Sequence, residues 1–160
     1  MRFIVICLLV IVGSTASVSA KPGCQKSQRL CRYEHGAYIK HFDRKELEVI
    51  DSRILIHRKT KKVYVLADIV APSSSAPQCA EEKLYGQRAK QHLAKLLTLD
   101  TRHNALTIEV IADIKNTNAS HVRIRNRFGT LGGQMIMDDY AIRKTDSMNY
   151  AETRRKNWCG

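Results

Sequence analysis

The chain has few prolines and comparatively few acidic side chains. Its 160 residues include three prolines and 15 aspartates and glutamates, against 27 lysines and arginines. With 44% hydrophobic and 26% charged residues, the composition excludes both wholesale disorder and a collagen-like chain. The length suffices for one domain with its own core but not for two. The formal net charge of +12 favours a polyanionic partner, either nucleic acid, acidic polysaccharide or an anionic membrane surface, although many basic proteins bind none of these.

Long hydrophobic runs are also missing, except for one near the N-terminus. A basic start at Met1-Arg2 precedes an apolar run over residues 3–12, and small residues follow up to Ala20. This order is typical of a cleaved secretory signal, and the run has about half the length that spans a bilayer. We therefore predict a signal peptide over residues 1–20 and a secreted or periplasmic protein without a membrane span. A retained anchor is the minor alternative.

Cysteine usage fits export. The leader contains Cys7, which leaves Cys24, Cys31, Cys79 and Cys159 in the mature chain. An even number in an exported protein favours two disulfides, and four cysteines allow three pairings. We favour Cys24–Cys31 as a local loop and Cys79–Cys159 as a bond between the C-terminus and the body. Zinc binding is the weaker alternative, because no C-x₂-C spacing occurs.

Hydrophobic patterning after residue 46 predicts one small α+β domain. The segment 71–77 is typical of a loop, and acidic residues after Ala80 open the clearest helix. Alternating apolar residues predict strands over residues 48–56, 62–70, 106–114, 121–128 and 131–137. We expect residues 21–45 to form a cysteine-containing N-terminal extension and residues 46–160 to form a five-stranded mixed barrel with helices.

Four segments in this order resemble the staphylococcal-nuclease-like, or thermonuclease, family. Residues 49–55 are similar to V-I-D-G-D-T-V, 65–73 to R-L-x-G-I-D-A-P-E, 85–97 to the family helix, and 128–132 to Y-G-R-x-L. The ending Trp158-Cys159 is similar to that of many exported bacterial members. The resemblance covers residues 46–160 and implies a five-stranded OB-fold, which agrees with the number of strands expected from the pattern.

The resemblance implies five functional positions, and at each of them this sequence has a residue of another type than the family. The calcium-binding aspartates correspond to Arg53 and Val70, the glutamate that activates water to Ser73, and the two phosphate-binding arginines to Val65 and Thr130. Calcium needs oxygen ligands, a serine hydroxyl is too weak a base, and neither Val65 nor Thr130 can make a bidentate phosphate contact. The sequence therefore predicts no catalytic residues, no metal site and no cofactor.

A displaced active site is the alternative that would keep the enzyme active. Asp51, Asp68 and Asp113 are the carboxylates that such a site could use to hold Ca²⁺. It would also need a new base and two new phosphate-binding side chains, so surface aspartates beside basic residues are the better interpretation.

The basic residues concentrate in three places. Arg123, Arg125 and Arg127 share one face of the strand predicted over 121–128, about 6.5–7 Å apart, where they could follow the phosphates of a single strand. Val122, Ile124 and Phe128 would face the core. The other basic residues lie in a hairpin tip with Arg58, Lys59, Lys61 and Lys62, and in a C-terminal tail with Arg154, Arg155 and Lys156. A solvated outer face is the alternative, since no aromatic residues for base stacking are obviously interleaved.

Together these features predict an exported, disulfide-containing nuclease homologue that has lost catalysis and binds a polyanion, with nucleic acid as the leading ligand. One alternative is an envelope protein associated with exopolysaccharide production, a setting in which members of the family also occur. Another is a calcium-dependent nuclease that hydrolyses phosphodiesters at a displaced site. We expect a monomer.

Overall fold

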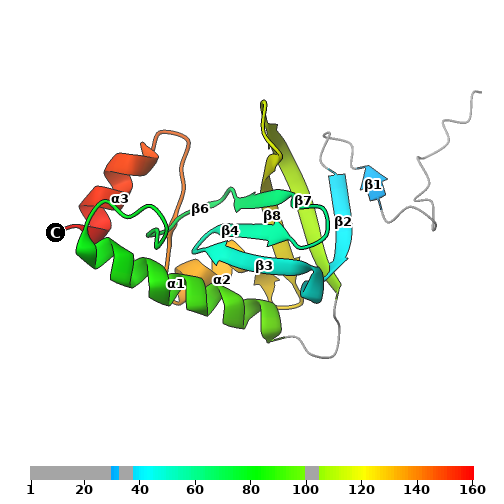
Figure 1. Cartoon of the computed structure of the whole chain (residues 1–160), viewed down its shortest axis with the longest axis horizontal. Coiled ribbons are helices and arrows are strands. Elements are labelled where there is room, and N and C mark those ends of the chain that lie inside the picture. The colour runs from blue at the N-terminus through cyan, green and yellow to red at the C-terminus, as the bar shows by residue number, and fades with distance from the viewer. Residues whose placement is uncertain (1–29, 33–37, 100–104) are drawn as a thin grey trace, which may run out of the picture.

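The computed structural model describes residues 30–32, 38–99 and 105–160. In these residues the chain is an α+β fold, in which a curled mixed sheet forms a half-barrel and helices pack at its side and one end (Figure 1). The strands are β1 (Leu30–Arg32), β2 (Tyr38–Asp43), β3 (Leu47–Asp51), β4 (Ile54–His57), β5 (Val63–Leu66), β6 (Ile69–Val70), β7 (Ala105–Ile114), β8 (Ala119–Asn126), β9 (Gly129–Thr130) and β10 (Ile142–Arg143). The helices are the 3₁₀ turn η1 (Arg44–Glu46), α1 (Ala80–Thr98), α2 (Leu131–Met137) and α3 (Tyr150–Trp158).

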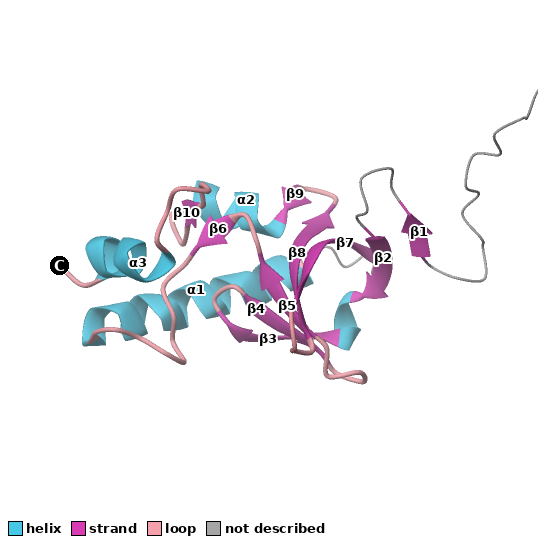
Figure 2. Cartoon of the chain, turned by 90° about the horizontal axis from the view of Figure 1, so that it is seen from above, coloured by secondary structure: helices cyan, strands magenta, loops and turns pink. Residues whose placement is uncertain are grey.

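The main sheet has the order β1-β2-β7-β8-β5-β4-β3, and β9 pairs with β8 beside this path. Neighbouring strands run antiparallel except β5 and β8, which pair in parallel with Val63 opposite Ala119. The short strands β6 and β10 form a separate antiparallel pair. Figure 2 shows this small pair beside α2, away from the long strands β7 and β8. An OB-like barrel is compatible with this arrangement.

The sheet begins earlier in the chain than residue 46. Strand β2 pairs with β7 along its whole length, from Tyr38 opposite Val110 to Asp43 opposite Ala105. These residues fall in the segment that the sequence assigns to the N-terminal extension. Part of that segment is therefore a strand of the main sheet.

Strand alternation and helix periodicity build the core. Along β8 the side chains of Val122 and Ile124 are fully buried, while Arg123 and Arg125 point outward. Helix α1 buries Ala89, Leu93, Leu96 and Leu97, spaced three or four residues apart, and lies along β3 (Figure 1). The helix therefore packs against β3, the last strand of the main sheet.

The strand predicted over residues 131–137 is wrong, because this segment is helix α2. The hydroxyl of Thr130 caps it by accepting a hydrogen bond from the Gly133 N–H at 3.1 Å. Leu131, Gly132 and Met135 are buried, a spacing that suits one face of a helix and not a strand. The Thr130 cap was the sequence signal that the strand interpretation overlooked.

The disulfide Cys79–Cys159 confirms the pairing favoured from the sequence, with the two Cα atoms 5.8 Å apart. It joins the N-terminus of α1 to the residue after α3, and Figure 1 shows these two helix ends side by side. Cys24 and the signal segment 1–20 lie outside the described residues, so the Cys24–Cys31 pairing and the signal peptide stay predictions. In the described part of the chain, none of the helices combines the length and the apolarity that crossing a bilayer requires.

Candidate functional site

The five positions that correspond to the family's functional residues have different structural surroundings. Val65 in β5 and Val70 in β6 are buried, and Thr130 serves as the cap of α2. Ser73 is buried in the loop after β6, and Arg53 lies in the turn between β3 and β4. Two of the five positions are thus apolar core, and one is committed to capping a helix.

Asp51, at the end of β3 and beside Ser73, has a heavily hydrogen-bonded carboxylate. Its Oδ1 accepts from the Ser52 N–H, the Ser74 N–H and the Ser74 hydroxyl, each at 2.9 Å. Its Oδ2 accepts from the hydroxyls of Ser73 at 2.5 Å and Ser75 at 2.7 Å. The carboxylate is only 4% exposed, so these five donors occupy it almost completely.

This environment makes Asp51 a weak base. Burial alone would raise its pKa, but the hydrogen bonds from Ser73, Ser74, Ser75 and Ser52 outweigh burial and lower the pKa to about 2. A carboxylate with so low a pKa takes up protons poorly near neutral pH. Asp51 is therefore suited to holding the serines in place.

The segment 71–79, which we call the serine loop, has a second anchor at Glu82. Its fully buried carboxylate accepts from the Ser73 N–H at 3.1 Å and the Gln78 N–H at 2.6 Å. Arg154 of α3 donates to the same carboxylate at 2.5 Å and to the Ala76 carbonyl at 2.6 Å. Burial raises the pKa of Glu82, but these hydrogen bonds lower it below its ordinary value. Arg154, predicted to be part of a basic tail, is instead a buried structural residue.

Arg53 and Tyr150 pack together beside Asp51. The Arg53 guanidinium lies 3.9 Å from the centre of the Tyr150 ring, and the Tyr150 hydroxyl donates to the Ala71 carbonyl at 3.2 Å. Burial lowers the pKa of Arg53, while Tyr150 and Asp51 act in the opposite direction. Because an arginine stays protonated in proteins, it places a positive charge beside the buried carboxylate. That charge opposes cation binding at this point.

The predicted row of three arginines is shorter than expected. Arg123 and Arg125 share the outward face of β8, but Arg127 lies in the turn between β8 and β9. Asn126 takes the last buried position of the strand, and its side-chain oxygen accepts from the Phe128 N–H at 2.8 Å. Phe128, expected in the core, is 55% exposed.

The turn at the end of β8 therefore presents an aromatic face among arginines. The Arg127 guanidinium lies 4.4 Å from the centre of the Phe128 ring, and Arg125 is exposed two residues away. Gln134 donates to Asn126 at 3.1 Å, which ties the turn to α2. This is the aromatic residue beside basic side chains that the sequence pattern did not reveal.

A separate cleft of about 430 Å³ lies between β8, at His121 and Arg123, and the segment around β10. We call it the β8–β10 cleft. Its cationic or titratable lining includes His121, Arg123, Arg143 and Lys144, and its acidic lining is Asp68 and Asp146. Burial, Lys144 and Arg53 together lower the pKa of His121, so its ring is neutral at pH 7. Sequence reasoning missed Arg143 and Lys144, because only the fold brings β10 beside β8.

The basic hairpin tip with Arg58, Lys59, Lys61 and Lys62 is less available for binding an anion than its charge suggests. Arg58 lies 3.5 Å from Glu48, Lys59 lies 3.4 Å from Glu46, and Lys62 lies 3.1 Å from Asp113. Lys61 is exposed, with a positive φ of 56° in the turn. Acidic neighbours therefore offset most of the positive charge of this hairpin tip. In β8, Arg123 is likewise paired, with Glu109 at 3.1 Å, whereas Arg125 is exposed.

The carboxylates considered for a displaced metal site lie in separate surroundings. Asp51 is held by the serine loop and Asp113 by Lys62 and Ser120. Asp68 packs against Gly132 of α2, and its Oδ1 is buried without a hydrogen-bond partner in the described part of the chain. Within the described ranges, no three His, Cys, Asp or Glu side chains gather into a set that could hold a metal ion. No protein-family model matches this sequence, and no curated protein matches it.

Proposed function

We propose that the protein is an exported, non-catalytic binding protein for a polyanion, with single-stranded nucleic acid as its ligand. The observation that carries the proposal is the exposed Phe128 ring beside Arg125 and Arg127. The β8–β10 cleft, whose lining includes Arg143 and Lys144, lies further along β8. Proteins that bind single strands combine a basic groove for the phosphates with aromatic faces for the bases. In this proposal the fold is an OB-like barrel of the staphylococcal-nuclease-like type, and the protein acts as a monomer.

The surroundings of Asp51 support the non-catalytic part of the proposal. Its carboxylate accepts five hydrogen bonds and has a lowered pKa, so it is a poor base. The Arg53 charge beside it opposes a divalent cation. A calcium-dependent nuclease would need another ligand set for the ion. Asp113 is engaged by Lys62 and Ser120, and among the described residues Asp68 belongs to no set of three side chains that could hold a metal ion.

Export fits the disulfide. Cys79–Cys159 persists in an oxidising compartment, and the leader-like segment at residues 1–20 would direct the chain there. We therefore infer a secreted or periplasmic location.

Fluorescence anisotropy with a labelled 12-nucleotide deoxythymidine strand tests the proposal. Phe128→Leu keeps an apolar side chain but removes the π face. It should weaken binding about 5- to 150-fold, which corresponds to about 1–3 kcal/mol for the loss of one base stack. Arg125→Ser should reduce the slope of log K against log salt by about 0.7, the value for one phosphate contact. Arg58→Ser, in the hairpin, is the matched control and should change both quantities less than Arg125→Ser.

Three results would contradict the proposal. The first is wild-type binding by Phe128→Leu and Arg125→Ser. The second is loss of binding only in Arg58→Ser, which would move the site to the hairpin. The third is displacement of the oligonucleotide by polygalacturonate at an equal concentration of charge. That last result would favour an acidic polysaccharide and hence a role associated with exopolysaccharide.

A further inference from the structure

Strand β3 ends the main sheet, and one side of its backbone faces no other strand in the described residues. The Arg58 N–H donates to the Glu46 carbonyl, and the His57 N–H donates to the Lys62 carbonyl on the opposite side. In an antiparallel pair these directions alternate along the strand. The pairs Leu47–His57 and Val49–Leu55 are therefore the ones that do not exchange hydrogen bonds. The Leu47 carbonyl and both backbone groups of Val49 point to the open edge.

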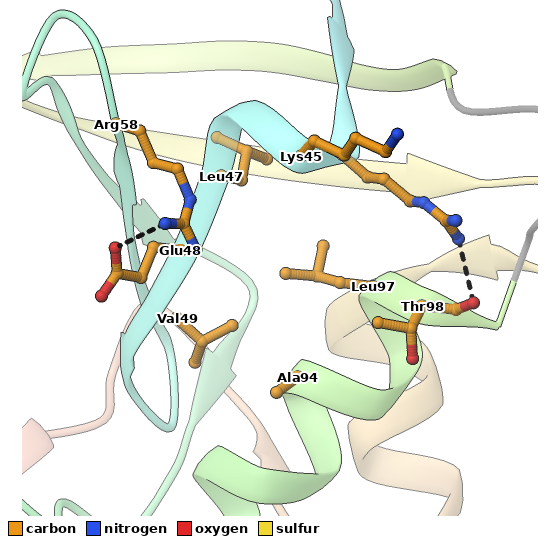
Figure 3. Close-up of a pocket in the computed structure, with 9 residues that line it drawn as sticks. Lys45, Leu47, Glu48, Val49, Arg58, Ala94, Leu97 and Thr98 are labelled. Carbon is orange, nitrogen blue, oxygen red and sulfur yellow. Dashed lines mark hydrogen bonds and ion pairs between the residues drawn. The ribbon is translucent and has the colours of Figure 1, made fainter.

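A groove of about 450 Å³ runs beside this edge, between β3 and the last turns of α1. Leu47 and Val49 line it from the strand, and Ala94 and Leu97 line it from the helix (Figure 3). Leu47 and Leu97 are buried, so the floor of the groove is apolar and belongs to the core. An added strand could therefore form backbone hydrogen bonds with the edge of β3. Every second side chain of that strand would pack on the apolar floor of the groove.

The rim of the groove is mostly basic. Arg44, Lys45 and Arg58 line it, against a single acidic residue, Glu48. Figure 3 shows Arg58 beside Glu48 at one side of the groove and Lys45 at its upper end. Arg44 reaches across to the Thr98 carbonyl at 3.0 Å and so connects the two walls. The charge of the rim complements an acidic occupant.

We propose that the β3 edge binds an extended acidic peptide segment of a partner protein, which adds to the sheet as one more strand. Main-chain hydrogen bonds to Val49 and the Leu47 carbonyl supply affinity, and alternate side chains of the peptide enter the apolar groove. The remaining side chains, being acidic, lie near Lys45, because Glu48 already pairs with Arg58. This surface is separate from Phe128 and the β8–β10 cleft, and the proposal does not depend on the proposed function.

The test uses a fluorescein-labelled peptide of alternating glutamate and valine, six residues long, and anisotropy with the mature protein. We expect saturable binding that weakens as salt is raised. Ala94→Glu places a negative charge in the groove while keeping a good helix former, and it should weaken binding at least tenfold. Leu84→Glu, at an exposed position of the same helix outside the groove, is the matched control and should bind like the wild type.

A second arm isolates the backbone contacts. The same peptide can be N-methylated at alternate residues in two ways, one of which removes the N–H groups that would face β3. That version should bind at least tenfold more weakly than the unmodified peptide. The proposal is overturned if the peptide does not bind, if Ala94→Glu binds it like the wild type, or if both methylated versions bind equally. Displacement of the peptide by the deoxythymidine strand, or a dimer that Ala94→Glu dissociates, would also overturn it, because the occupant would then be nucleic acid or a second copy.

Discussion

Replacing Asp51 by asparagine should destabilise the protein mainly by removing a charge that the serine loop is built to hold. The amide keeps the size of the carboxylate and one strong acceptor oxygen. Its NH₂ group, however, points where Oδ1 or Oδ2 now accepts from Ser73, Ser74 or Ser75. The serine hydroxyls can turn to accept from it, but the Ser74 N–H cannot. The variant therefore tests the charge and its donors without opening a cavity.

The expected magnitude follows from the pKa of Asp51. A fall from the ordinary 3.8 to about 2 in the folded state corresponds to roughly 2.5 kcal/mol of stability. Because the unfolded chain takes up this proton first as the solution becomes acidic, the contribution is complete above about pH 5. It declines as the pH falls through 3.8 towards 2. The wild type should thus exceed Asp51→Asn by about 2.5 kcal/mol at pH 7, and the difference should shrink between pH 5 and pH 2.

Urea unfolding followed by circular dichroism at a series of pH values measures this difference. Asp146→Asn, at an exposed position, is the control, and its stability should lie within about 0.5 kcal/mol of the wild type throughout. If Asp51→Asn costs less than about 1 kcal/mol at pH 7, or if its deficit in stability is the same at pH 7 and pH 3, the charge of Asp51 does not stabilise the serine loop.

Three further outcomes follow from the packing of the serine loop. Reducing Cys79–Cys159, which closes a separation of 80 residues, should lower the free energy of unfolding by about 4 kcal/mol on the chain-entropy estimate, and equal urea midpoints with and without reductant would contradict it. Gly86→Ala should cost about 1–3 kcal/mol in the same assay, since a Cβ there overlaps the loop backbone, and an unchanged midpoint would show that the loop yields easily. Arg154→Met should cost about 3–5 kcal/mol because it leaves the Glu82 charge buried and unpaired, and a loss under 1 kcal/mol would mean that water reaches Glu82.

The sequence predicts those parts of the fold that depend on local pattern. Helix α1 follows from its acidic first turn and apolar periodicity, and the inner face of β8 follows from the alternation of Val122 and Ile124. The Cys79–Cys159 bond was favoured from the sequence among three possible pairings, and only the structure decides for it. The helix and the strand face, in contrast, are encoded within a few residues.

The errors arise where tertiary contacts override the local pattern. Extending the alternation of β8 to Phe128 placed that ring in the core, but the strand ends at Asn126 and a turn follows. Arg154 was predicted to belong to a basic C-terminal tail. Its neighbours in the sequence do not indicate that it contacts Glu82, which lies far away along the chain. The sequence predicts the serine loop only as a loop between two regular elements. Its hydrogen bonds to Asp51 could not be predicted, because they form only when the fold places β3 beside it.

One measurement tests most directly the claim that the protein binds single strands without cutting them. The mature protein is incubated with an end-labelled single-stranded oligonucleotide in millimolar Ca²⁺, and samples are run on native and denaturing gels. We predict a retarded band on the native gel and full-length strand on the denaturing gel. Fragments that depend on Ca²⁺, or an unretarded intact strand at micromolar protein, would contradict it.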